Sequence, residues 1–328
     1  MDGIKTFLAS LISSGALGIG AARWMVKHLV DHRLKKDLKD HQAKLDEKLA
    51  TTKAEFDNDL ATTKAELEAK LRLQVDEILG EKAAERQYRL EARKHLYTAI
   101  GPLRFQLLAA CSDFVNRISS IGSGVQRYST TLKGYFGQST TFRLLRLIAI
   151  SELIERQVAH ADFSVEPSTA ALLRFKQAAF DCLSSSLVSL NHPETNWNDQ
   201  VEHLYRDSIS IVASTVIVHR HVDVQRIMTF DEFHRAIVKE SFDDDLLPLI
   251  RIMEGFSVSE RPIFWFRLLA LAQLCHGFAA NEANKVGLRI EAFDGRKLIS
   301  TTCDPFIKSN LESYAAVLTR LETLCDAP

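Results

Sequence analysis

Proline is absent from the first 101 residues, and part of that stretch repeats with a period of eleven. All 7 prolines lie at Pro102 or later, so no proline interrupts a helix before that point. The heptapeptide LATTKAE occupies 49–55 and returns unchanged at 60–66. Eleven residues make three turns of about 3.67 residues each, which keeps an apolar stripe on one side of a nearly straight helix. We therefore predict a long helix with a hendecad coiled-coil stalk at 31–81.

Extending the period in both directions defines the stripe. Its apolar positions are Leu38, Leu45, Leu49, Phe56, Leu60, Leu67, Leu71 and Ile78. Polar residues lie between them at the same period, and ion pairs such as Glu66 with Lys70 are spaced four apart. Each such pair contributes only about 0.2–0.5 kcal/mol, so burial of the stripe against a partner helix is the larger stabilising effect. We expect a parallel homo-oligomer, most simply a dimer; a solvated single helix acting as a spacer is the alternative.

An uncharged apolar segment lies at 6–22, between Lys5 and Arg23. Apolar residues continue past Arg23, and the flanking basic side chains can extend toward the lipid headgroups, so the segment approaches the roughly 20 residues that cross a bilayer core. A cleavable signal peptide usually begins with positive charge, whereas here the basic residues follow the apolar run. We expect an uncleaved transmembrane anchor with its basic flank at 1–30. A signal peptide and a short buried helix are the alternatives.

Charge and residue size within and after this segment indicate its orientation and packing. The basic residues that follow it are Arg23, Lys27, Arg33, Lys35 and Lys36. The positive-inside rule then places the rest of the chain in the cytoplasm, with a single span in the inner (cytoplasmic) membrane and basic side chains near its lipid. Small residues recur every fourth position at Ser10, Ser14, Gly18 and Ala22. This spacing allows two membrane helices to approach closely, although small residues are frequent in such helices anyway.

Composition excludes several classes of protein. The 41 basic and 42 acidic side chains nearly cancel, so we expect no nucleic-acid binding driven by bulk charge. An apolar content of 46% excludes wholesale disorder. The 5 cysteines are scattered and contain no CxxC pair, which argues against a disulfide framework or a zinc knuckle and favours buried, reduced thiols.

From residue 82 onward the apolar residues are dense enough for a core. Local start and stop signals predict helices at 81–118, 139–159, 167–190, 198–218, from 229 onward, 246–256, 261–284 and 305–325. Gly101-Pro102 predicts a kink. The β-branched end of 198–218 allows a short strand, and alternation around Asp294-Gly295 allows a hairpin at 288–299. The fold class is therefore mainly α, with an α-helical bundle domain at 82–328 and at most a minor β hairpin.

The run at 262–280 is the second most apolar part of the chain. Arg267, Gln273 and His276 lie within it and would be costly in lipid, whereas in a soluble bundle they need only local partners. We expect a buried core helix here.

The sequence contains no GxxxxGK[ST], complete GxGxxG, HExxH, GxSxG or EF-hand motif. We therefore assign no catalytic, cofactor-binding or metal-binding residue and expect no cofactor. Weaker groupings are His219, His221 and Asp223; Glu152 and Glu155; Asp243, Asp244 and Asp245; and Arg143, Arg146 and Arg156 with Tyr128 and Tyr135. We interpret them in turn as structural or surface histidines, surface or salt-bridged glutamates, helix-capping aspartates and solvated arginines.

The whole layout resembles bacterial proteins of unknown function that have an N-terminal span, a Lys/Glu-rich coil and a helical domain. The stretches that carry the resemblance cover about two thirds of the chain and read RLEARKHLYTAIGPLR, STTFRLLRLIAISELI, MTFDEFHRAIV and RLLALAQLCHGFA. The resemblance implies a bacterial inner-membrane setting and assigns no activity.

Three functions fit these features. We favour a membrane-anchored module that oligomerises through its coil and whose helical domain binds a cytoplasmic protein or ligand, as in bacterial stress or phage-defence systems. The alternatives are an enzyme with an unrecognised motif in the helical domain and an effector that perturbs the membrane through its N-terminal span.

Overall fold

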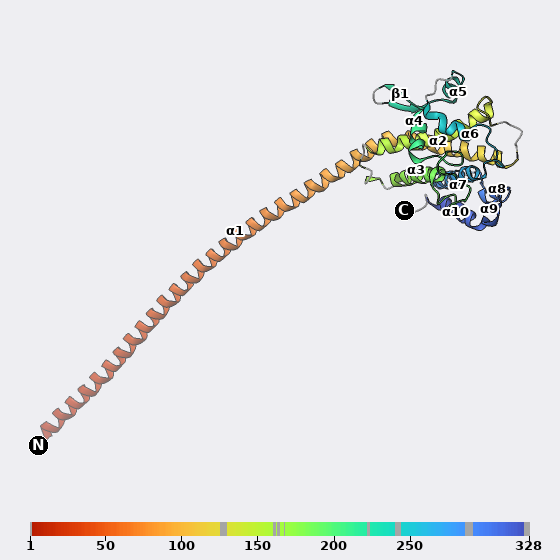
Figure 1. The fold of residues 1–328 in the computed structure, drawn as a ribbon. Coiled ribbons are helices and arrows are strands. Elements are labelled where there is room, and N and C mark those ends of the chain that lie inside the picture. Colours follow the sequence, from red (N-terminus) through yellow and green to blue (C-terminus); the bar gives the residue numbers. More distant parts are fainter. Residues whose placement is uncertain are drawn as a thin grey trace. The chain divides into compact units, whose positions relative to one another are not determined.

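A computed structural model describes residues 2–124, 130–159, 162, 165–166, 168–221, 224–239, 244–285 and 291–324; at 2–19, 21, 168, 220–221 and 224 it describes the backbone alone. The described residues are mainly helical and include one small antiparallel sheet (Figure 1). The chain divides into two compact units, Met1–Glu85 and Arg86–Pro328. Helix α1, Asp2–Gly122, contributes residues to both.

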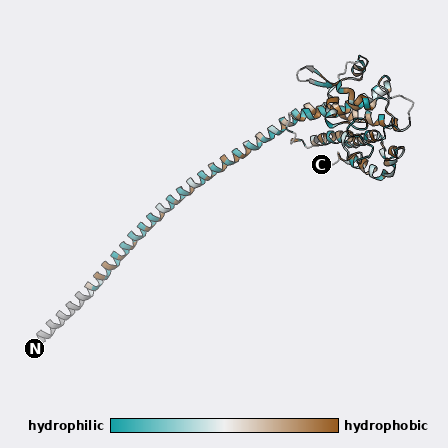
Figure 2. Cartoon of the chain, viewed as in Figure 1, coloured by the Kyte–Doolittle hydropathy of each residue, from teal (hydrophilic) through white to brown (hydrophobic). Residues whose placement is uncertain are grey.

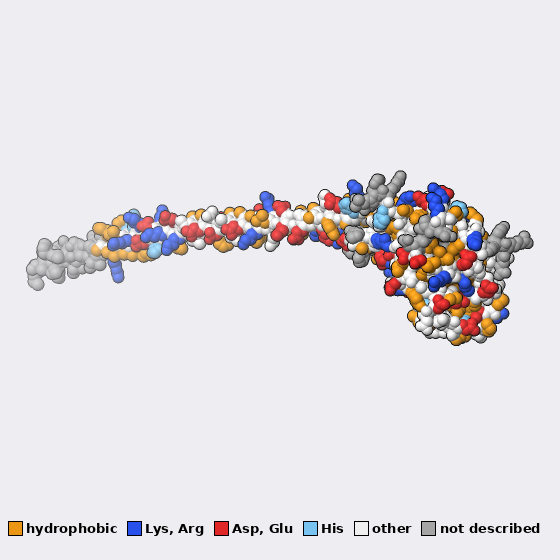
Figure 3. Space-filling model, turned by 45° about the horizontal axis from the view of Figure 1, so that its top comes forward, with side chains coloured by type: hydrophobic (Ala, Val, Ile, Leu, Met, Phe, Trp, Pro, Cys, Tyr) orange, Lys and Arg blue, Asp and Glu red, His pale blue; other side chains and the backbone are white. Residues whose placement is uncertain are grey.

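The first unit is helical throughout its described length. Acidic and basic side chains are interspersed along the part of it that is drawn in colour (Figure 3). Every described side chain from Ala22 to Glu85 is exposed. The predicted anchor at 6–22 lies almost entirely among residues whose side chains are outside the description, so it stays a prediction.

The second unit contains the core. Its helices after α1 are α2 Tyr135–Val158, α3 Ser168–Ser184, α4 Arg206–Ser214, α5 Phe230–Val238, α6 Leu247–Met253, α7 Pro262–Lys285, α8 Gly295–Ile299, α9 Pro305–Ser309 and α10 Leu311–Thr323, with a 3₁₀ turn at Asp244–Leu246 before α6. Apolar residues concentrate in these helices (Figure 2). Helix α7 packs against α3, α8 and α10, and α2 packs against α3 and α4.

Helix α7 is the centre of this core. Among the described residues it is the one helix long and apolar enough to cross a membrane, yet 89% of its most apolar window is buried inside the protein. Gln273 Oε1 accepts from Gly295 N at 3.2 Å, whereas His276 Nδ1 lies 3.4 Å from Glu322 Oε1 without a hydrogen bond. This burial agrees with the prediction of a core helix.

A glycine sets the distance between α7 and α10. A Cβ at Gly277 would collide with the backbone carbonyl of Glu322 on α10. The absence of a side chain therefore allows the two helices to approach closely at this point.

The small sheet follows α4. Strands β1, Ile217–His221, and β2, Val224–Ile227, pair antiparallel with Ile217 opposite Ile227. The short strand allowed after 198–218 is thus present. The capping box that starts α5 is also confirmed, because the Thr229 side chain accepts from Glu232 N while Glu232 accepts from Thr229 N at 2.8 Å.

The hairpin predicted at 288–299 is wrong in its described part, where Gly295–Ile299 form helix α8. Asp294 caps α8 instead of forming a turn, since its Oδ1 accepts from Lys297 N at 3.0 Å. The bond from Gly295 N to buried Gln273 fixes this arrangement, and the predicted residues 288–290 lie outside the described residues.

Three predicted helices are also longer than the observed ones. The predicted helix at 167–190 ends at Ser184, where the 185–205 segment begins. The predicted helix at 305–325 is split at Asn310, whose Nδ2 donates to Phe306 O at 2.8 Å. The predicted helix at 198–218 is formed only from Arg206 to Ser214, because the preceding residues bond to other parts of the domain. Helix α1 continues past Pro102, whose side chain faces solvent.

Candidate functional site

The segment between α3 and α4, residues 185–205, forms a compact loop without helix or strand. Its ends meet where Leu204 N donates to Leu183 O at 3.0 Å. Leu190 and Asn191 adopt left-handed backbone conformations, with φ of 52° and 50°. A left-handed leucine is strained and persists only where the surroundings hold it, so other parts of the domain must fix this 185–205 loop.

The main support of the loop is the buried side chain of Arg267 on α7. Its Nη1 donates to the carbonyls of Cys182 and Ser185, at 3.1 and 2.9 Å, and Nη2 donates to Ser189 Oγ at 3.2 Å. Its Nε donates to the carbonyl of Glu202 at 3.0 Å, at the other end of the loop. Burial lowers the pKa of Arg267 to about 10, so it remains a cation at neutral pH.

The charge of Arg267 is stabilised by the end of a helix. Cys182 and Ser185 lie at the carboxyl end of α3, where unpaired carbonyls carry partial negative charge. A guanidinium presents several donors in one plane and can bond to both carbonyls at once. The buried arginine thus caps α3 and holds the loop together.

Two buried contacts attach the loop to the carboxyl-terminal helices. His192 Nε2 lies 3.1 Å from Asp304 Oδ1, and the same carboxylate oxygen caps α9 by accepting from Ile307 N at 2.7 Å. The hydroxyl of Tyr314, on α10, donates to Ser189 O at 2.9 Å, and burial raises its pKa.

A third contact joins the loop to the start of α7. Glu202 Oε2 accepts from Phe264 N at 2.6 Å, in the first turn of that helix. Burial raises the pKa of Glu202 to about 7, even though this bond and the nearby charges of Arg261 and Arg267 favour the carboxylate. The carboxyl group therefore titrates near neutral pH in the folded protein.

The outer surface of the loop carries exposed apolar side chains, namely Leu187, Trp197, Val201 and Tyr205. The Arg267 guanidinium lies 5.9 Å from the Trp197 ring centroid. Arg267, Tyr314 and Glu202 hold the backbone of the loop through the hydrogen bonds described above. The loop therefore presents a preformed surface.

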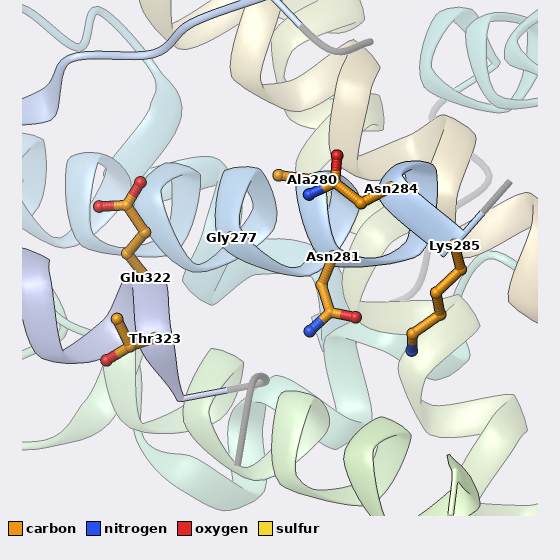
Figure 4. A pocket seen from close by; sticks show the side chains of 7 residues that line it. All are labelled: Gly277, Ala280, Asn281, Asn284, Lys285, Glu322 and Thr323. Carbon is orange, nitrogen blue, oxygen red and sulfur yellow. The ribbon is translucent and has the colours of Figure 1, made fainter. Parts of the chain in front are cut away.

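A separate open groove of about 580 Å³ lies between α7 and α10 (Figure 4). Asn281 and Lys285 extend to one side of α7 and Asn284 to the other, and Glu322 comes from α10. Lys285 Nζ donates to Glu282 Oε1 at 2.7 Å. A smaller cavity of about 230 Å³ includes the exposed thiol of Cys303 in its lining.

The predicted coiled-coil stripe lies on α1 with all of its side chains exposed by between 50% and 69%. Two polar residues of the stripe bond to their own helix: Thr52 Oγ1 donates to Lys48 O at 2.7 Å and Thr63 Oγ1 to Asp59 O at 2.6 Å. In the predicted membrane packing face, Ala22 is exposed, whereas the side chains of Ser10, Ser14 and Gly18 lie outside the description.

The predicted glutamate pair is salt-bridged, as expected. Lys176 Nζ lies 3.0 Å from Glu152 Oε2 and also pairs with Glu155. Arg156 extends this cluster by donating to Ser214 Oγ at 2.9 Å.

The arginine group contacts α1 rather than solvent alone. Arg143 Nη1 donates to Asp113 O at 2.8 Å, and Arg146 Nη1 lies 3.1 Å from Asp113 Oδ2. Tyr135 contacts Phe230, and Tyr128 lies outside the described residues. The interpretation as solvated arginines is therefore wrong for Arg143 and Arg146, because both hold α2 to α1.

The histidine and aspartate groups are only partly described. His219 is exposed on β1, while the His221 side chain and Asp223 lie outside the description. Asp244 and Asp245 lie in the turn before α6, and Asp243 is not described. The described residues contain no cluster of His, Cys, Asp and Glu suited to a metal ion.

Sequence reasoning missed the 185–205 loop as a site. The Asn191-His192-Pro193 sequence predicts only the end of a helix. The sequence also indicates that Arg267 needs polar partners, but the partners of Arg267 lie more than 60 residues away in the chain. The density of Asn, Ser and Pro within the loop was the available signal.

Comparisons with protein-family models, with curated proteins and with solved structures found no match to this chain.

Proposed function

We propose that this protein is a single-pass protein of the bacterial inner membrane whose stalk associates with further copies of the chain and whose helical domain is a cytoplasmic interaction module. The exposed eleven-residue stripe of the stalk is the observation that carries the proposal. The basic residues after the apolar segment support the orientation.

The threonines of the stripe are suited to a buried interface. Because Thr52 and Thr63 donate to carbonyls of their own helix, their hydroxyl hydrogens need no partner on another chain. Their methyl groups can then contact the apolar residues of a neighbouring stripe.

The period of the stripe favours a second copy as its partner. A helix with a seven-residue repeat would drift out of register with an eleven-residue one, whereas an identical stalk keeps the same register along the whole stripe. Copies anchored at the same end also hold equivalent residues at similar heights. The proposed oligomer is therefore parallel and in register.

Replacing Leu49, Phe56, Leu60 and Leu67 by Ser tests this oligomer. Each side chain contributes about 1.5–3 kcal/mol when fully buried, which exceeds the ~0–1 kcal/mol of an exposed ion pair. Sedimentation equilibrium of residues 31–328 should show an oligomer for the wild type and a monomer for the variant.

Leu73→Ser is the matched control. Leu73 is 70% exposed and lies two residues after Leu71, on the opposite side of the helix. This variant should associate like the wild type. A monomeric wild type at micromolar concentration would show that the stalk is a solitary spacer.

A further inference from the structure

The 185–205 loop exposes apolar side chains on a backbone that is held in place. Trp197, Val201 and Tyr205 are 39%, 43% and 40% exposed, on a segment whose backbone is fixed from below by Arg267. Apolar side chains held rigidly at a surface lose little entropy on binding, and Trp and Tyr are the residues enriched in binding hot spots.

Ring contacts fix the positions of the aromatic side chains. The ring of His203 lies 4.5 Å from the Trp197 ring and 5.3 Å from the Tyr205 ring, measured between centroids. The hydroxyl of Tyr205 donates to Trp197 O at 2.9 Å. The three rings therefore form one preorganised unit.

His203 supports the aromatic side chains from inside the domain. It is only 1% exposed, and neither of its ring nitrogens has a hydrogen-bond partner among the described residues. Burial and the charge of Arg267 lower its pKa. Because the ring is buried, it positions Trp197 and Tyr205 and does not itself contact a partner.

The charges of the loop indicate the chemistry of that partner. Its charged side chains are Glu194, Asp199 and Glu202, and the loop contains no Lys or Arg. Glu194 and Asp199 are exposed, and Asp199 is close enough to His203 to act on its charge. The opposing charge of Arg267 lies on the inner side and is bonded to the end of α3.

We propose that the surface formed by Trp197, Val201 and Tyr205, with His203 buried behind the two aromatic rings, binds a basic, apolar peptide segment of a protein partner. Aromatic faces attract guanidinium and ammonium groups and contact their aliphatic stems. Glu194 and Asp199 attract the same groups over a longer range. The inference rests on the proposed function in that the domain binds a protein, and it does not require the stalk to oligomerise.

The test uses the full chain in non-ionic detergent and a phage-displayed library of random twelve-residue peptides. Peptides selected on the wild type should contain Arg, Lys and apolar residues above the library frequency. The affinity of one selected peptide, measured by fluorescence anisotropy, should fall at least about tenfold for Trp197→Ala.

Two further variants keep the test decisive if Trp197→Ala misfolds. Asp199→Lys reverses an exposed charge and should also weaken binding by about tenfold or more, with an unchanged circular dichroism spectrum. Phe105→Ala removes an aromatic ring that is 72% exposed on α1 and should not change the affinity.

Selection of acidic peptides, selection of none, or equal affinity for Asp199→Lys would overturn the inference. The stalk variant with four Ser substitutions separates it from the oligomer proposal. That variant should bind the selected peptide like the wild type, even where the stalk proves to be monomeric.

Discussion

At the scale of single residues, two charged side chains at the 185–205 loop bond to helix ends. Arg267 bonds to the last carbonyls of α3, and Glu202 bonds to the first turn of α7. The positive charge of Arg267 lies at the carboxyl end of α3, which carries partial negative charge. Glu202 lies at the amino end of α7, which carries partial positive charge. Glu202 belongs to the 185–205 loop and Arg267 bonds to it. A change in the ionisation of either group therefore changes the contacts that hold the loop.

The raised pKa of Glu202 predicts how the free energy of unfolding depends on pH. Its pKa of about 7 in the folded protein exceeds the ordinary value of 4.5, so the folded state binds more protons than the unfolded state between these values. The free energy of unfolding should therefore fall as pH rises from about 4.5 to about 7, by on the order of 1–2 kcal/mol after allowance for partial exposure.

Glu202→Gln should remove this part of the pH dependence. The amide oxygen can still accept from Phe264 N, so the variant should resemble the wild type at pH 4.5 and be more stable at pH 8. Urea denaturation at several pH values measures the effect. Glu194→Gln makes the same charge change on the exposed side of the loop and should retain the wild-type slope; an equal change in both variants would contradict the assignment to Glu202.

At the scale of elements, two helices with long apolar runs behave differently. Helix α7 is surrounded by α3, α8 and α10, whereas the stripe on α1 is exposed in the single chain. The apolar face of α7 is broad enough for a core, while the stripe is narrow and suited to one neighbouring helix. This difference is why we propose a partner helix for the stripe and none for α7.

Gly277→Ala tests the close approach of α7 and α10. The added methyl group would meet the Glu322 carbonyl, which belongs to a helix backbone and cannot rotate away. We expect a loss of about 1–3 kcal/mol in the free energy of unfolding, as for other overpacked cores. Gly80→Ala has nothing within 4 Å of the new Cβ and should leave the unfolding of the domain unchanged. A Gly277→Ala domain as stable as the wild type would show that the helices separate at little cost.

At the scale of the whole molecule, the proposed anchor determines where the protein resides. Full-length protein should remain in the membrane fraction after carbonate washing, and deletion of residues 1–30 should release a soluble protein that keeps its helical content. A carboxyl-terminal tag should react with a probe only when the cytoplasmic side is accessible. Recovery of the full chain in the soluble fraction without detergent would contradict the anchor.

The sequence alone determined the features that depend on local order. The absence of proline before Pro102 and the eleven-residue repeat predict the long helix, and the Thr229 and Glu232 pair predicts the start of α5. The polar residues of α7 distinguished a core helix from a membrane span. In each case the deciding interactions join residues a few positions apart or depend on composition.

Only the tertiary structure decided the 185–205 loop and the role of Asp294-Gly295. A helix at 198–205 was locally acceptable, but Arg267 and Phe264 offer the backbone and side chain of Glu202 better partners. Asp294-Gly295 fits a hairpin turn as well as a helix cap, and the bond to Gln273 selects the cap. These partners lie 22 to 65 residues apart in the chain, so no local pattern encodes them, and burial makes their hydrogen bonds costly to leave unmade.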